Sequence, residues 1–133
     1  MALPSGHLTL RQLVALFETL PVDITFVDAD DRVAFFSEGP NRVFPRNPAI
    51  IGRRVQDCHP PASMHIVQKI VDEMRQGARD LAEFWIEMHG RFVHIRYFAV
   101  RKGGQYLGCL EVTQDVTAIR ALAGERRLLA EVM

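Results

Sequence analysis

The segment LAEFWIEMHGRFVHIRYFAVR (Leu81–Arg101) alternates apolar and polar residues on both sides of a central His89-Gly90. Such alternation is typical of β-strands with one buried face, and a two-residue link ending in glycine is typical of a tight hairpin turn. The segment therefore predicts an antiparallel hairpin with strands over 81–88 and 92–101.

A turn at His89-Gly90 also fixes which residues of the two strands lie opposite each other. The predicted cross-strand pairs are Phe84–Ile95, Ile86–Val93, Glu83–Arg96 and Trp85–His94. The first two pairs are entirely apolar, so their face of the hairpin is expected to line the core. The other face is expected to point outward.

Toward the C-terminus, a second turn at Gly103-Gly104 predicts one more strand over 106–117. Residues 118–132 are predicted to form a terminal helix. Its sparse apolar stripe consists of Ile119, Leu122, Leu129 and Val132. A stripe of this kind usually packs against a partner helix.

Toward the N-terminus, residues 61–76 predict an amphipathic helix with one apolar face. The segment 38–61 is rich in proline and glycine, which favours loops and short helical turns. Two apolar runs, 22–28 and 32–37, flank an aspartate-rich turn and predict another hairpin. Residues 8–20 predict a first helix.

The composition is that of one ordinary globular domain. The 133 residues are 48% apolar and 24% charged, which suffices for one core. The net charge is zero and the basic residues are scattered, so nucleic-acid binding is not expected. No secretion signal and no apolar run of about 18 residues occurs, so we expect a cytoplasmic protein without membrane contact.

The predicted order of elements resembles the PAS fold. The phrases ITFVDADDRVAFFS (Ile24–Ser37) and YLGCLEVTQDVTAI (Tyr106–Ile119) are similar to the opening hairpin and the closing strand of PAS domains. The resemblance implies an α+β fold, with a five-stranded antiparallel sheet, a helical belt on one face, and N- and C-terminal helices. The implied parts are an N-terminal helix (1–20), a PAS core (21–117) and a C-terminal signalling helix (118–133).

Two longer phrases resemble a particular PAS subgroup. Residues 35–74 and 82–101 are similar to the C-terminal PAS domain of DUF438-type bacterial proteins. This implies a sensory or signalling module that binds a small apolar ligand or a protein partner. Nucleophile-elbow, zinc-protease and phosphate-loop motifs are missing from the sequence, so no enzyme activity and no catalytic residues are expected.

The fold implies a ligand pocket between the sheet and the belt. The candidate pocket residues are Phe26, Phe35, Phe44, Val67, Ile70, Phe84, Ile86, Val93, Ile95, Tyr97 and Val112. Ordinary core packing is the alternative interpretation of the same aromatic residues. The family also implies a signal relay at Asp115, Val116 and Thr117, where the last strand meets the exit helix.

No cofactor is assigned, and the alternative to a small-ligand module is a haem- or metal-binding sensor of gas or redox state that uses His59 or His65. Cys58, His59 and His65 are the candidate haem ligands, although helical geometry turns His65 away from the apolar face of its helix. A metal site is not expected. The aspartate-rich turn around Asp30 lacks the rest of a calcium loop and is predicted to be solvated.

A homodimer is predicted from apolar residues that the core does not use. The candidate interface residues are Leu10, Leu13, Val14, Phe17, Trp85, Phe92 and Phe98. The first four form one face of the N-terminal helix, and the last three lie on the outer sheet face. Covering the aromatic patch with the helix, from the same chain or a partner, would bury both.

Overall fold

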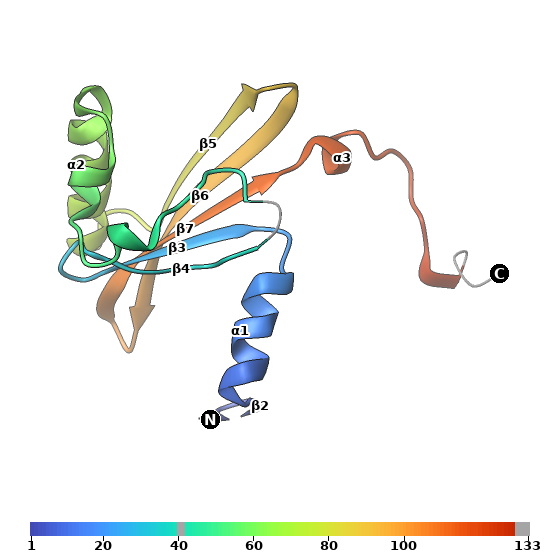
Figure 1. The fold of residues 1–133 in the computed structure, drawn as a ribbon, viewed down its shortest axis with the longest axis horizontal. Helices are drawn as coiled ribbons and strands as arrows, with labels where there is room; N and C mark the ends of the chain where they lie inside the picture. The colour runs from blue at the N-terminus through green and yellow to red at the C-terminus, as the bar shows by residue number, and fades with distance from the viewer. Residues whose placement is uncertain (40–41, 130–133) are drawn as a thin grey trace.

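The centre of the molecule is a five-stranded antiparallel sheet with strand order β4-β3-β7-β6-β5 (Figure 1). The computed structural model describes residues 1–39 and 42–129. The strands are β3 (Asp23–Asp28), β4 (Val33–Phe36), β5 (Leu81–Met88), β6 (Arg91–Lys102) and β7 (Gln105–Asp115). The predicted α+β class and five-stranded sheet are confirmed.

The β5–β6 hairpin has the predicted register. Phe84 lies opposite Ile95 and Trp85 opposite His94, and the other two predicted pairs are also present. His89 and Gly90 have φ angles of 50° and 76°. Positive φ at both positions is what the tight hairpin turn requires, so a local signal fixed the faces of both strands.

The helical belt covers one face of the sheet, which we call the inner face. It consists of two short 3-10 helices, η1 (Pro48–Ile50) and η2 (Val55–Cys58), followed by the long helix α2 (Pro61–Arg75). Three apolar side chains of α2 are buried: Ile70, Val71 and Met74. Gly77 follows the helix with φ 80°, the left-handed conformation that is typical of a glycine just after a helix.

The first helix, α1 (Leu10–Thr19), projects away from the sheet beneath β4 (Figure 1). Thr9 caps it through a reciprocal pair of hydrogen bonds with Gln12, of 2.9 and 3.0 Å. A small hairpin that the sequence analysis missed, β1 (Ala2–Leu3) and β2 (Gly6–His7), precedes the helix. Helix α1 meets the sheet where the rings of Phe17 and Phe35 lie 5.3 Å apart.

The C-terminal helix is much shorter than predicted. Helix α3 spans only Thr117–Arg120, and residues 122–127 are not helical. Leu122 and Leu129 of the predicted stripe are 77% and 70% exposed, so the stripe has no surface to pack on. A short helix without tertiary packing is marginal in water, which explains the error. Val132 lies outside the described residues.

Candidate ligand-binding site

A cavity of about 920 Å³ lies between the inner face of the sheet and the belt. The sheet residues that line it are Thr25, Val27, Val33, Phe84, Ile95, Tyr97, Cys109 and Glu111. Helix α2 adds Val67 and Ile70, and the belt adds Phe44 and Arg46. The volume lies within the range of small-molecule sites, and most of the lining is apolar.

Six of the predicted pocket residues line this cavity: Phe44, Val67, Ile70, Phe84, Ile95 and Tyr97. Phe84, Ile95 and Tyr97 were placed by the hairpin register, and Val67 and Ile70 by the helix periodicity, whereas Phe44 lies in the loop before η1. Ile86 and Val93 lie on the same face of the sheet but do not line the cavity. Val93 is fully buried in the core, while Ile86 is 40% exposed.

For β3, β4 and β7, the pocket prediction chose side chains on the wrong face of the sheet. Phe26, Phe35 and Val112 lie on the outer face, because Thr25 and Val27 of β3 face the cavity. One of the polar side chains of β3 that point inward finds its partners on the segment before the belt helices. Asp23 is 7% exposed and accepts hydrogen bonds from the backbone N–H groups of Val43 and Phe44.

A row of polar side chains crosses the inner face. Thr25, Glu111 and Tyr97 lie directly opposite one another on β3, β7 and β6. Arg46 of the belt pairs with Glu111 at 3.0 Å. Burial, together with the charge of Glu111 and a hydrogen bond to it, raises the pKa of Tyr97. The hydroxyl of Thr25 is buried and has no partner among the described residues.

The haem-ligand candidates divide into two groups. Cys58 and His59 line the cavity, whereas His65 lies exposed outside it, as helix geometry predicts. Burial lowers the pKa of His59 and favours the neutral imidazole; the nearby charge of Arg46 acts in the same direction, and that of Glu111 opposes it. In the described ranges, no three histidine, cysteine or acidic residues are grouped so that they could hold a metal ion.

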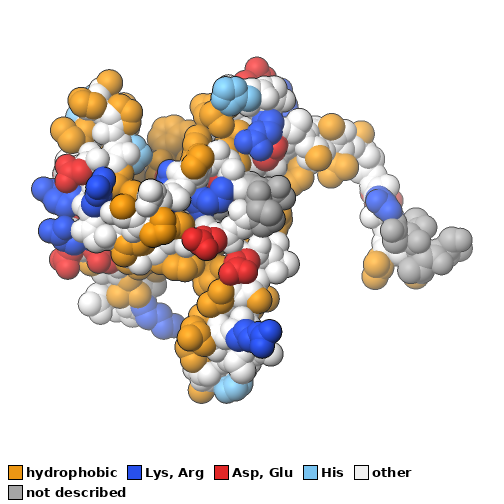
Figure 2. Space-filling model, in the orientation of Figure 1, with side chains coloured by type: hydrophobic (Ala, Val, Ile, Leu, Met, Phe, Trp, Pro, Cys, Tyr) orange, Lys and Arg blue, Asp and Glu red, His pale blue; other side chains and the backbone are white. Residues whose placement is uncertain are grey.

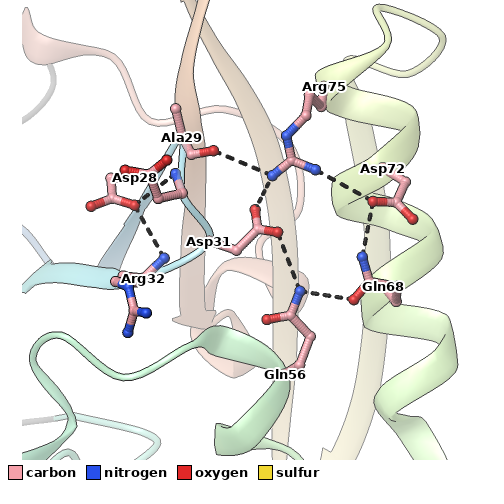
Figure 3. A network of polar contacts seen from close by, with 9 residues as sticks. Asp28, Ala29, Asp31, Arg32, Gln56, Gln68, Asp72 and Arg75 are labelled. Atoms are coloured by element: carbon pink, nitrogen blue, oxygen red, sulfur yellow. Dashed lines mark hydrogen bonds and ion pairs between the residues drawn. The ribbon is translucent and has the colours of Figure 1, made fainter.

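The aspartate-rich turn between β3 and β4 anchors the belt (Figure 3). Asp31 forms an ion pair with Arg75 of α2 and accepts a 3.2 Å hydrogen bond from Gln56 of η2. Gln56 also donates to Gln68 of α2 at 2.8 Å. The turn is therefore not simply solvated as predicted: Asp31 is 7% exposed and holds η2 and α2 against the sheet beside the cavity.

The predicted relay residues connect the ends of two strands to α3. Asp115 accepts hydrogen bonds from the backbone N–H and the hydroxyl of Thr117, at 3.0 and 2.5 Å. These bonds lower the pKa of Asp115. Phe92, at the start of β6, donates to the Thr117 hydroxyl and accepts from the Val116 N–H. A displacement of β6 or β7 would therefore act directly on α3.

Helix α1 does not cover the aromatic patch of Trp85, Phe92 and Phe98 on the outer face of the sheet. Trp85 is 61% exposed, and the guanidinium groups of Arg120 and Arg96 lie over the rings of Phe92 and Phe98. Helix α1 contacts the sheet at β4 instead, where Phe17 meets Phe35. The alternative in which α1 covers the aromatic patch of its own chain is therefore wrong. Figure 2 shows apolar side chains along α1, consistent with the fact that none of its residues is buried.

Comparison with known proteins identifies relatives of the whole fold. A family model described as "PAS domain" matches residues 13–117. The C-terminal domain of a protein from Streptococcus mutans is 33% identical, with a TM-score of 0.87, and the match covers 92% of this chain and 96% of that one. A comparison with curated proteins found no match.

More distant solved structures share the fold. A PAS domain from Colwellia psychrerythraea is 16% identical with a TM-score of 0.57, covering 82% of this chain and 98% of that one. A sensory box sensor histidine kinase from Vibrio cholerae is 15% identical with a TM-score of 0.55, covering 79% of this chain and 89% of that one.

Among the described residues, no helix is long and apolar enough to cross a membrane.

Proposed function

Because the chain belongs to the PAS domain family, we propose that it is a sensory module that binds a small ligand and relays its state through its C-terminal segment. The observation that carries the proposal is the cavity between the belt and the inner face of the sheet. Sensor histidine kinases among the structural relatives support a signalling role. We assign no catalytic step to it.

The path from the cavity to α3 is short. Tyr97 and Glu111 line the cavity from β6 and β7, and the same two strands carry Phe92 and Asp115 at the α3 junction. A ligand shifts such a system only by its difference in affinity for the two states. We propose that contacts with the inner face of β6 and β7 provide this difference.

Whether the cavity is open can be tested by filling it with a larger side chain. Val67→Phe should change the free energy of unfolding by less than about 1 kcal/mol, because the added ring enters space that is already present. The same change at the fully buried Val93, which does not line the cavity, should cost about 2–3 kcal/mol. Urea unfolding followed by circular dichroism measures both. Equal losses would mean that the cavity is collapsed core.

The second candidate is a haem-binding sensor with His59 as the iron ligand. It is supported by the position of His59 in the cavity wall and by the low pKa of its imidazole. The two propionates of haem would require two cationic partners, but of the two arginines in the cavity wall Arg46 is already paired with Glu111, which leaves only Arg53 among the described residues that line it. The residues present therefore fit haem less well than a small organic ligand.

We also propose membership in the C-terminal PAS subgroup of DUF438-type proteins. The support is the 33% identity with a C-terminal domain from Streptococcus mutans over nearly the full length of both chains. A cytoplasmic location and the division into 1–20, 21–117 and 118–133 stay predictions.

We propose a homodimer through α1, whose Leu10 and Val14 are 67% and 46% exposed. Light scattering should give the mass of two chains for the native protein and of one chain for the double variant Leu10→Lys, Val14→Lys. Both positions are exposed, so the variant should still fold. Leu122→Lys, at a 77% exposed position elsewhere, is the control and should leave the dimer intact. A dimeric double variant would refute this interface.

A further inference from the structure

The charges that line the cavity restrict the ligand it can hold. Two arginines, Arg46 and Arg53, and two acids, Asp57 and Glu111, contribute to the wall, so their formal charges cancel. The Arg46–Glu111 pair is largely buried, with side chains 25% and 13% exposed. Arg53 and Asp57 are exposed to solvent, whereas the partly buried charges of Arg46 and Glu111 already neutralise each other. A charged group placed beside Glu111 would therefore lack a buried counter-ion of its own, which is costly where solvation is poor.

Glu111 nevertheless retains capacity for one more interaction. Arg46 contacts its Oε1 atom and Tyr97 also forms a hydrogen bond to this carboxylate, but a carboxylate has about four acceptor positions, so at least one stays available. Glu111 lies at the centre of the polar row, between Thr25 and Tyr97 on the neighbouring strands. Such a carboxylate can accept a hydrogen bond from a donor group on a ligand.

Thr25 provides an independent sign of a missing partner. Its residue is 6% exposed, it lines the cavity directly opposite Glu111, and its hydroxyl is unpaired among the described residues. Leaving a buried hydroxyl unpaired is unfavourable, so a ligand group that bonded to it would gain affinity. Rotation about its Cα–Cβ bond would turn the hydroxyl toward the space that the side chain already borders.

We propose that the cavity binds a neutral, largely apolar molecule bearing an N–H or O–H group that donates to Glu111. This deepens the proposed function and rests on it. The apolar body would lie against Phe84 and Tyr97, whose rings are 6.0 Å apart in an edge-to-face arrangement, and against Val67 and Ile70 of α2. Thr25 would provide a second polar contact beside the donor.

Four matched probes test the proposal by NMR titration of the full chain. They are indole, which is neutral with an N–H; 1-methylindole, which lacks the N–H; indole-3-acetate, an anion; and tryptamine, a cation. Indole should bind about tenfold or more tightly than each of the other three, with shifts at Thr25, Val67 and Glu111. Comparable binding of 1-methylindole or of a charged probe would overturn the proposal.

Charge variants provide a sharper readout. Glu111→Gln leaves Arg46 without its carboxylate, so the preference should move toward indole-3-acetate. Arg46→Gln, on the belt, should move it toward tryptamine and keeps the test available if Glu111→Gln misfolds. Glu83→Gln, on an exposed strand position opposite Arg96, is the matched control and should leave the order of affinities unchanged.

The outcomes separate this proposal from the proposed function. Binding of charged probes alone would overturn the neutral-ligand inference while leaving a ligand-binding module. No binding of any probe, together with a large destabilisation by Val67→Phe, would overturn both. A charge preference that is unchanged in both variants would place the probes away from Glu111 and refute its role.

Discussion

Replacing Gly108 with alanine is expected to lower the free energy of unfolding by about 3–5 kcal/mol. Gly108 of β7 has φ 149°, and a Cβ atom there would lie 2.1 Å from the backbone oxygen of Val27 and 2.8 Å from the ring of Phe26. Neither neighbour can move easily, since β3 and β7 are paired in the middle of the sheet. The strands would have to separate locally.

Chemical denaturation of the variant and of Gly104→Ala measures the effect. Gly104 lies in the β6–β7 turn with φ 79°, but a Cβ there meets nothing within 4 Å. The control should therefore lose only the cost of the left-handed backbone, about 1–2 kcal/mol. Similar losses at the two positions would show that backbone conformation, and not the approach of β3, determines the need for glycine.

The second large effect is expected at Asp31. Asp31→Ala should destabilise the protein by about 2–3 kcal/mol, because it removes the buried acceptor that Arg75 and Gln56 share and leaves them only their contacts outside the β3–β4 carboxylate. The value lies below that of a fully buried ion pair, since the Arg75 side chain is 38% exposed. The left-handed backbone of Asp31, with φ 63°, adds to the cost because alanine tolerates it less well.

The neighbouring Asp30 provides a matched control for this prediction. Its side chain is exposed, so Asp30→Ala should change stability by less than about 0.5 kcal/mol. Amide exchange should also be faster at residues 55–58 in Asp31→Ala than in Asp30→Ala, because η2 loses its anchor. Protection of η2 that is equal in both variants would contradict the anchoring role.

Local signals explain why much of the fold was predictable from the sequence. The β5–β6 register depends only on the two residues of the turn at His89 and Gly90. The ends of α2 and the cap of α1 at Thr9 likewise depend on residues within one turn of the helix. Interactions between residues that are close in the sequence can be recognised from the local sequence alone.

The errors arise where a partner is distant in sequence. Asp23 faces inward because the backbone of Val43 satisfies it across 20 positions. The ion pairs Arg46–Glu111 and Asp31–Arg75 span 65 and 44 positions. The apolar–polar alternation of β3 could not reveal that the face carrying Asp23 and Thr25 is the one turned toward the belt, and so Phe26 was misplaced.

The predicted C-terminal helix shows a second limit of prediction from sequence. The stripe of Ile119, Leu122 and Leu129 has helical spacing, but these side chains are 54%, 77% and 70% exposed. Periodicity reports which face would be buried if a helix formed. Whether it forms depends on a surface that supplies the burial energy, and residues 122–127 have none within the described part of the chain.

The exposed position of Trp85 makes the outer face optically distinguishable. It is the only tryptophan in the sequence, and it lies on the side of the sheet opposite the cavity. Its fluorescence emission should therefore have the long wavelength of a hydrated side chain. Filling the cavity should leave that wavelength unchanged, whereas a second molecule seated on the outer face should shift it toward the blue.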